Sequence, residues 1–468
     1  MTTATEQAGG TGRTLIRGGT IIDGTGRPAM RDGAVVVAGE RIAWVGPARE
    51  APEGPYDLVI EAAGKTMMPG LIDAHCHTSY GEVRTHEEEG MYPGAEYSAI
   101  RAAWNMQKVL RAGVTGICDP GSRWGVAVAV RDAMAAGLVE GPRMTAAGQM
   151  ISTHASIGDL FPLWVGSPPS NVGVLCNTRD EMVREVRRQV KQGVDLIKVA
   201  GSGDPNPVWT PSGDVPSLSL DELKAIVEET HRLGKKVTIH ARAGLAVRYA
   251  AEAGVDWVIH GDLMNETDLG ALLKTGIPIC PTLTLLVNTV EWGHLVGASQ
   301  GLMDSYKRLI DSSVKILSLA RQAGLRFMAG TDAGFAVTPF GHWHARELEI
   351  FVKYLDFTPM EAIMAATRNN AVAVNLEQDG GVLEPGRYAD LLVVDGDPLG
   401  DIRVLQDRAR LAVVMKGGRC VDLRHPWPQA REMRYERTHF MTRRTLYYDT
   451  VYGPREGVKT ERDGGDGV

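Results

Sequence analysis

Eight short apolar segments recur through the middle of the chain, and most of them are separated by stretches with helical spacing. The apolar segments are 67–72, 114–118, 144–147, 196–199, 237–239, 257–259, 277–280 and 325–329. The clearest helical stretches between them are 180–191, 221–233, 245–253 and 303–323. Short apolar runs that alternate with helical patterns predict βα units and a parallel sheet. Eight such units over about 300 residues predict an α/β fold of the (β/α)8 TIM-barrel type.

A doubly wound sheet is the alternative fold, but it would not so naturally place reactive residues after most of its strands. Both ends of the chain carry β-type patterns, at 14–22, 34–37 and 42–45 and again between 381 and 421. Neither end is long enough to bury a core by itself. We therefore predict one composite β-domain built from both chain ends.

The expected domain bounds follow from these patterns. The composite β-domain takes residues 14–64 and 380–424, and the barrel takes residues 65–379. Residues 425–468 form a C-terminal extension rich in arginine and tyrosine. Acidic residues offset its charge, so we expect it to pack over the barrel or against another subunit of a homo-oligomer, and not to bind nucleic acid.

Composition narrows the class of protein. The 50 basic and 57 acidic residues give a net charge of −7 without a long run of one sign, which gives no support for a nucleic-acid or anionic-membrane partner. No apolar run reaches the roughly 18 residues of a membrane span, and residues 1–13 lack the apolar segment of a signal peptide. The five cysteines are widely spaced and form no CxxC pair, so we expect free thiols in the cytoplasm.

Four long loops follow predicted strands three, four, seven and eight, at 149–176, 201–217, 281–300 and 334–343. In a barrel these loops meet at the end where the active site lies. They contain several large apolar side chains, among them Trp164, Trp209, Trp292, Phe335 and Trp343. We therefore expect a substrate pocket with apolar walls.

Reactive side chains stand where the predicted barrel strands end. They are His75 and His77 after strand one, Lys198 on strand four, His240 and His260 on strands five and six, and Asp332 after strand eight. Alternate residues of a strand point the same way, and the carboxyl ends of barrel strands share one mouth, so these six side chains should converge. Neutral imidazoles and a carboxylate bind zinc, cobalt, manganese and related ions, which predicts a divalent metal site.

Lys198 needs a separate argument, because a protonated lysine is a poor metal ligand. Desolvation beside cations would lower its pKa and let it react with CO2 to form a carbamate, which is a bridging carboxylate. Two metals about 3.5–4 Å apart would need such a bridge. Each of the six residues taken alone has an ordinary structural interpretation, but their order at the ends of five strands favours the metal site.

Three motifs resemble the amidohydrolase superfamily: residues 69–77, 330–334 and 383–391. The resemblance extends over nearly all of residues 14–422 and implies a TIM barrel with a small composite β-sandwich domain built from both chain ends. It also implies a binuclear metal centre. In that centre His75, His77 and Asp332 would hold one ion, His240 and His260 the other, and carboxylated Lys198 would bridge them. Zinc is the expected metal, although cobalt, manganese or nickel would suit the same ligands.

The resemblance further implies hydrolysis of a C–N bond in a small-molecule substrate through a metal-bridging hydroxide. Asp332 would act as the general base and pass the proton to the leaving amine. His154, in the loop after strand three, matches a substrate-polarising histidine and is expected to stabilise the oxyanion; the alternative is a structural loop histidine. Asp73 is expected to orient a ligand imidazole or to cap backbone donors.

The substrate class remains open between several branches. Residues 197–203 are similar to the imidazolonepropionase-like, Xaa-Pro dipeptidase and ochratoxinase branch, but Leu218 stands where the dipeptidases usually carry a tyrosine. Chain length and the C-terminal tail look more like the phenylurea and molinate hydrolases. We therefore expect a fairly apolar amide, urea or carbamate as substrate. The alternatives are an Xaa-Pro dipeptidase or N-acyl amino acid hydrolase, with Arg242 or Arg123 holding a carboxylate, or an imidazolonepropionase-like cyclic amidohydrolase.

Overall fold

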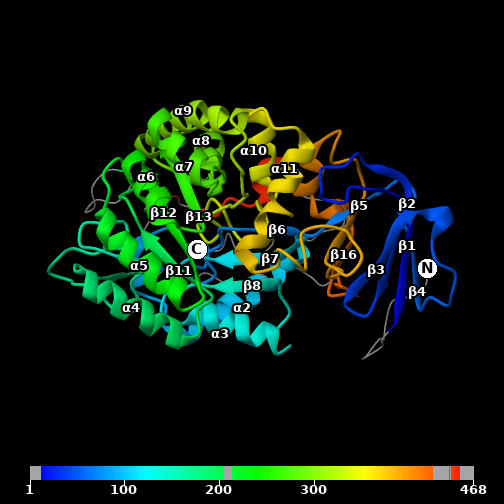
Figure 1. The fold of residues 1–468 in the computed structure, drawn as a ribbon, viewed down its shortest axis with the longest axis horizontal. Coiled ribbons are helices and arrows are strands. Elements are labelled where there is room, and N and C mark those ends of the chain that lie inside the picture. The colour runs from blue at the N-terminus through cyan, green and yellow to red at the C-terminus, as the bar shows by residue number, and fades with distance from the viewer. Residues whose placement is uncertain (1–11, 205–212, 425–441, 443, 454–468) are drawn as a thin grey trace, which may run out of the picture.

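The computed structural model describes residues 12–204, 213–424, 442 and 444–453, and its two parts lie side by side in Figure 1. Its strands are β1 (Arg13–Ile21), β2 (Met30–Ala38), β3 (Arg41–Pro47), β4 (Leu58–Glu61), β5 (Thr66–Pro69), β6 (Leu71–Asp73), β7 (Val114–Asp119), β8 (Arg143–Ala146), β9 (Met150–Ser152), β10 (Gly173–Leu175), β11 (Leu196–Ala200), β12 (Lys236–Ala243), β13 (Trp257–Leu263), β14 (Ile279–Cys280), β15 (Leu391–Val394), β16 (Leu411–Lys416) and β17 (Arg419–Cys420). Its α-helices are α1 (His86–Gly90), α2 (Ala95–Arg111), α3 (Val126–Ala135), α4 (Arg179–Gln192), α5 (Leu220–Arg232), α6 (Gly244–Ala253), α7 (Glu266–Thr275), α8 (Thr284–Val296), α9 (Gln300–Gln322), α10 (Arg346–Tyr354), α11 (Pro359–Ala365) and α12 (Tyr448–Tyr452). Among the described residues no helix is long and apolar enough to cross a membrane.

Parallel strands form a ring in chain order. One sheet contains β6, β7 and β8, and a second runs β10-β9-β11-β12-β13-β14. The peptide N of Asp195 donates to Ala146 O at 2.8 Å and joins β8 to the start of β11. On the other side residues 326–329 lie between β14 and β6, because Ile279 N donates to Arg326 O and Ala74 N donates to Ala329 O, both at 3.0 Å. The predicted (β/α)8 arrangement is confirmed, with the helices outside the ring (Figure 1).

Local sequence signals explain where several barrel helices begin and end. Thr178 and Ser219 accept hydrogen bonds from backbone N–H groups three residues ahead and cap the first turns of α4 and α5. Glycines with positive φ end α4 and α6 at Gly193 and Gly254. These signals agree with the helices predicted at 180–191, 221–233 and 245–253.

The predicted first barrel strand, 67–72, was wrong as one element, because the structure divides it at Gly70. The part before Gly70 is β5, which pairs with β1 and β15, and the part after it is β6, which pairs with β7. Gly70 N donates to Asp390 O whereas Leu71 N donates to Gly113 O, so the chain crosses between the two sheets here. A Cβ on Gly70 would lie 2.1 Å from Thr115 Oγ1, which explains the glycine. An apolar run alone cannot reveal which sheet it joins.

Other predicted elements also differ from the structure. Residues 281–300 are mostly helix α8 rather than a loop, and 149–176 contains the short strands β9 and β10. Residues 325–329 make one isolated bridge, between Phe327 and Ile279, and 381–383 form no strand. Long-range contacts decide the state of these segments, and periodicity does not.

Both chain ends contribute to one β-domain. Its eight strands follow the order β17-β16-β15-β5-β1-β2-β3, with β4 also paired to β1. Ile42 N donates to Arg387 O and Ala389 N donates to Glu40 O, which joins the hairpin of β2 and β3 back to the segment before β15. The sheet encloses an apolar cluster drawn from both ends of the chain, including Ile16 and Val393. The predicted sandwich is therefore one continuous sheet. Backbone hydrogen bonds join the β2–β3 hairpin at one end of this sheet to the segment before β15.

Candidate metal centre and substrate pocket

His75 and His77 follow β6 and lie against Asp332, which follows the eighth segment of the ring. Their two Nε2 atoms are 3.0 Å apart, and Asp332 Oδ1 lies 3.3 Å from the first and 3.2 Å from the second. The peptide N of Asp332 donates to His75 O at 2.9 Å, so the backbones of the two segments are also joined. All three residues are buried.

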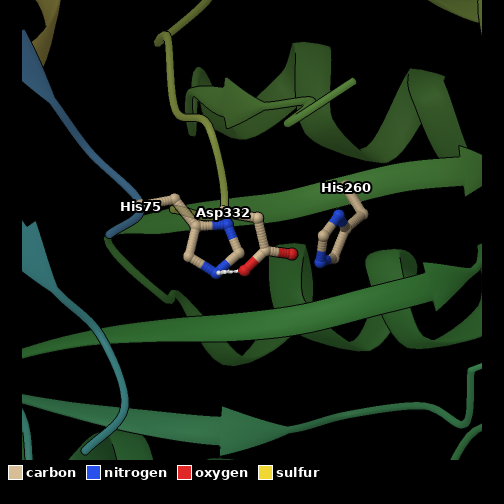
Figure 2. A group of neighbouring side chains, drawn as sticks. All are labelled: His75, His260 and Asp332. Carbon is tan, nitrogen blue, oxygen red and sulfur yellow. Dashed lines mark ion pairs between the residues drawn. The ribbon is translucent and has the colours of Figure 1, made fainter. Parts of the chain in front are cut away.

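His240 and His260 approach the same point from β12 and β13. Their ring centroids are 4.6 Å apart, and the His260 ring lies 5.5 Å from that of His75. Figure 2 shows Asp332 between His75 and His260, and one ligand atom from each of these three lies within 4.8 Å of the other two. Lys198 on β11 is 1% exposed and lines the same cavity. The structure therefore brings all six predicted metal ligands together.

The backbone at this mouth adopts conformations that side chains with a Cβ rarely use. The φ angles of His260, Thr282 and Asp332 are 79°, 57° and 56°. Each such residue costs of order 1–3 kcal/mol and persists only where the surroundings enforce it. Two of the three are predicted ligands and the third touches one, since Thr282 Oγ1 lies 3.1 Å from His75 Nδ1. Three of the nine described non-glycine residues with positive φ therefore lie at this site.

Burial sets the charge of these groups. It lowers the pKa of His75 and of His260 well below the usual value, and burial with the charge of Arg242 lowers the pKa of His240 to about 3. Burial would also lower the pKa of His77, but its hydrogen bond to Asp332 raises that pKa above the usual value. Burial lowers the pKa of Lys198 to about 8. His75, His240 and His260 are therefore uncharged near neutral pH, with lone pairs free to bind a cation.

The donor set fits divalent metal ions. His260 Nδ1 is buried and has no hydrogen-bond partner among the described residues, which is costly unless another group satisfies it. His77 Nδ1 lies 2.7 Å from Gly121 O and donates to it, so Nε2, which faces Asp332, is the atom that would bind a metal ion. Neutral imidazoles beside one carboxylate are typical zinc, cobalt or manganese ligands.

Asp73 connects β6 to the turn that carries Asp332. Its carboxylate accepts from His75 N at 3.0 Å and from Thr331 N at 3.2 Å, and it lies 2.7 Å from His344 Nδ1. Asp73 therefore caps backbone donors, which was one of the two predicted roles. His344 completes this contact and is absent from the cavity wall.

The structure does not bring His154 to the cluster. His154 is exposed, its peptide N donates to Asn177 Oδ1 at 3.0 Å, and it is absent from the cavity wall. Its predicted oxyanion role stays a prediction. Cys76, between the two histidines that follow β6, is fully buried in the apolar core, as its place on the opposite strand face predicts.

The cavity walls are largely apolar. They are formed by Tyr80, Met150, Ile157, Leu160, Val172, Leu285, Tyr306 and Phe335, together with Glu89, Asp204, Arg242 and the six clustered residues. Tyr80 stacks on His77 with ring centroids 4.3 Å apart, and Phe335 meets Tyr80 edge-on at 5.3 Å. Of the five loop aromatics expected there, Phe335 lines the cavity; Trp164 is exposed, Trp292 and Trp343 pack elsewhere, and Trp209 lies outside the described residues.

A buried charged triad closes one side of the cavity. Arg242 Nε donates to Asp204 Oδ2 at 2.7 Å, and Arg242 Nη1 donates to Asp262 Oδ2. Sequence reasoning named Arg242 but missed both aspartates. A signal existed for Asp262: Arg242 and Asp262 follow His240 and His260 by two residues each, so the period of two places all four on one face of the sheet. Tyr80 and Thr282 lie outside strands, where no periodicity could mark them.

Comparison with known proteins shows which family the chain resembles. Residues 66–421 match the Amidohydrolase family. Ochratoxinase from Aspergillus niger is 30% identical over 435 residues, which cover 87% of this chain and 86% of that protein. The crystal structure of a Xaa-Pro dipeptidase with bound methionine superposes with a TM-score of 0.78 at 26% identity, over 87% of this chain and 99% of that one. Molinate hydrolase, at 23% identity and a TM-score of 0.72 over 88% of this chain and 95% of that one, shares the fold.

The family match extends over the barrel and over the C-terminal part of the β-domain. The matches support an enzyme that hydrolyses amide-type carbon–nitrogen bonds. The chain belongs to the amidohydrolase family.

Proposed function

We propose that this protein is a binuclear metal-dependent hydrolase that cleaves an amide, urea or carbamate bond in a small, uncharged and largely apolar substrate. The geometry of the six clustered residues supports the metal centre, and the composition of the cavity wall supports the substrate class. The proposal rests most directly on one observation: Arg242, the one arginine among the described residues of the cavity wall, is already paired with Asp204 and Asp262.

His75, His77 and Asp332 would hold one divalent ion, and His240 and His260 would hold the second. Bound divalent ions would lower the pKa of a water molecule and polarise the carbonyl group of the substrate. Lys198, carrying a carbamate on its Nζ, would supply a further carboxylate ligand. Because its pKa is lowered to about 8, a fraction of this amine is neutral near pH 7 and can bond to CO2, releasing a proton as the carbamate forms.

Asp332 would move the proton. Its Oδ1 faces the two histidines after β6, and its side chain lines the cavity where a substrate would bind. We assign Oδ1 to accept the proton of the attacking water and to deliver it to the nitrogen of the leaving amine. Thr338 Oγ1 donates to the Asp332 carbonyl O at 2.7 Å and helps to fix this residue.

Among the described residues of the cavity wall, a free carboxylate on the substrate would find no unpaired cation outside the proposed metal centre. Arg242 is already engaged by Asp204 and Asp262, so the group of three carries a net negative charge. Arg123, the other candidate, is fully buried, donates from Nη2 to Ser79 O at 2.6 Å, and is absent from the cavity wall. Leu218, at the position where the dipeptidases usually carry a tyrosine, packs in the core. An N-acyl amino acid or dipeptide would therefore bind less well than a neutral amide.

A matched pair of substrates tests this proposal. N-benzoylphenylalanine and N-benzoylphenethylamine share the amide and both rings, and they differ by one carboxylate. We expect the protein, analysed for bound metal, to cleave the neutral compound with the higher kcat/KM, and to cleave some members of a panel of N-aryl ureas, carbamates and anilides. Cleavage confined to Xaa-Pro dipeptides or N-acyl amino acids would overturn the substrate class and favour the dipeptidase alternative.

A further inference from the structure

We propose that residues 444–452, which we call the C-terminal clasp, position the loop after the eighth barrel segment and thereby set one wall of the substrate pocket. This loop, residues 334–344, carries Phe335, which lines the cavity. The inference rests on the proposed function, since it concerns the pocket in which the substrate would bind. The clasp includes α12 and is part of the red segment in Figure 1.

Leu446 joins the clasp to both ends of the loop. Its peptide N donates to Ala336 O at 2.8 Å, next to Phe335, and its carbonyl O accepts from Trp343 Nε1 at 2.8 Å. The Leu446 side chain is fully buried and belongs to the main core cluster. One residue of the clasp therefore satisfies two polar groups of the loop and fills space beneath it.

Further contacts extend the clasp across the loop and onto α8. Tyr448 N donates to His342 Nδ1 at 3.1 Å, and Arg444 N donates to Val296 O at 3.0 Å, at the end of α8. Tyr452 packs against Trp292 of α8 and against Trp343 of the loop, with ring centroids 6.0 and 6.4 Å away. The loop is thus fixed to a helix of the barrel through the clasp.

The opposite side of the loop faces the site. Val83 N donates to Gly334 O and Ala336 N donates to Val83 O, both at 3.0 Å, so the loop is held between residue 83 and the clasp. Phe335 therefore sits in a segment that is bonded on both sides. Its ring contacts Tyr80, which stacks on His77, and displacement of the loop would reach both the pocket wall and a metal-ligand ring.

The free-energy cost of removing the clasp contacts should fall mainly on the loop 334–344. Trp343→Phe would leave Leu446 O without its donor, at a cost of about 1–3 kcal/mol for a buried polar group. Truncation of Leu446 would leave a void directly under the loop. Because Phe335 and Ala336 are adjacent, we expect the loop to loosen first, and the remainder of the barrel to keep its fold.

Two substitutions test the clasp in the full-length, metal-loaded protein. Leu446→Ala removes the buried side chain, and Trp343→Phe removes the indole donor while keeping a ring. We expect either variant to increase deuterium uptake in residues 334–344 and to raise KM for the preferred neutral substrate about tenfold, with a smaller change in kcat. Phe335→Ala should raise KM similarly, and its combination with Leu446→Ala should raise KM by less than the product of the two single effects.

Leu15→Ala in β1 is the matched control, because it truncates a buried leucine in the β-domain. A purely structural role for the clasp predicts that Leu446→Ala and Leu15→Ala both lower the melting temperature and leave KM alone, and that result would overturn the proposal. Unchanged uptake in 334–344 would overturn it as well, whatever the substrate. Increased uptake in a protein that cleaves none of the tested compounds would support the clasp and overturn only the proposed function.

Discussion

The β-domain and the mouth of the barrel differ in how they bury charged residues and in how much backbone strain they carry. In the β-domain the core cluster is apolar throughout, and charged residues pair at the surface, as Arg17 does with Glu61, where both side chains are more than half exposed. At the barrel mouth Arg242, Asp262 and Lys198 are buried, an imidazole nitrogen lacks a partner among the described residues, and three side chains sit on left-handed backbone. The described part of the β-domain holds one such backbone angle, at Asp32, and one buried charged residue, Asp390, so the mouth carries more of these free-energy costs.

This difference shows that features which lower the free energy of unfolding gather at the proposed site of binding and reaction. Buried charges, strained backbone and shifted pKa values each cost free energy, and in proteins they gather where ligands bind or react. The two regions belong to one polypeptide. The same type of substitution can therefore be made in each region and its effects compared in the same protein.

The largest difference should come from removing the proposed proton carrier. Asp332→Ala should retain bound metal through the histidines and lose about a thousandfold or more in kcat, since the attacking water would lose its base. Asp379→Ala, which removes the exposed partner of Arg41 in the β-domain, should leave kcat unchanged. Steady-state kinetics with metal analysis measures both. Near-normal turnover in Asp332→Ala would refute the general-base assignment.

The next difference concerns the buried lysine. Lys198→Ala should lower metal content from two ions per chain and reduce turnover with it, because the bridging carbamate could no longer form. Elemental analysis of the purified variant measures the change, and Lys65→Ala, a partly exposed lysine at the edge of β5, is the matched control. Two ions per chain in Lys198→Ala would exclude the carbamate bridge.

Removing the buried arginine of the charged triad should lower the free energy of unfolding more than removing an exposed arginine of the β-domain. Arg242→Met leaves Asp262 buried without its cation and should lower the free energy of unfolding by about 3–5 kcal/mol. Arg17→Met breaks an exposed pair and should leave the unfolding transition where it was. Denaturant unfolding of both variants measures this contrast, and equal effects would mean that burial does not distinguish the two arginines.

The smallest expected difference is in how folding stability depends on pH. The contribution of Glu347 in the barrel and that of Glu61 in the β-domain should change with pH in opposite directions. Burial raises the pKa of Glu347, which accepts from Leu283 N and Thr284 N at the start of α8, to about 7. Between the unfolded value of 4.5 and about 7 the unfolded chain binds fewer protons than the folded one, so this group's contribution to stability falls as pH rises, by up to about 3 kcal/mol, and is constant above that range.

Glu61 in the β-domain behaves in the opposite way, because its hydrogen bond to Arg17 lowers its pKa. Its contribution is present above the unfolded pKa and is lost as pH falls through the folded one. Unfolding curves from pH 3 to 8 for the parent, Glu347→Gln and Glu61→Gln isolate the two slopes. A parent curve that stays parallel to that of Glu347→Gln between pH 5 and 7 would contradict the first assignment.

The sequence predicted the barrel and the positions of its reactive residues well because both follow from local patterns. Short apolar runs indicate strands, helix caps such as Ser219 indicate where helices begin, and the barrel topology then places every strand end at one mouth. Prediction failed where contacts distant along the chain decide the structure of a segment. Residues 67–72 cross from one sheet to the other, and residues 284–296 form a helix whose first N–H groups are capped by the distant Glu347.

By itself, then, the sequence determined which residue types stand at the carboxyl ends of the strands, and with them the class of chemistry. Only the tertiary structure decided that Arg242 is shared by two aspartates, that His154 lies outside the cluster, and that Leu446 holds the loop of Phe335. The physical reason is the range of the interactions. Periodicity and capping act within one turn or one strand, whereas the pairing of a buried charge or carbonyl depends on residues that are tens to more than a hundred positions away along the chain.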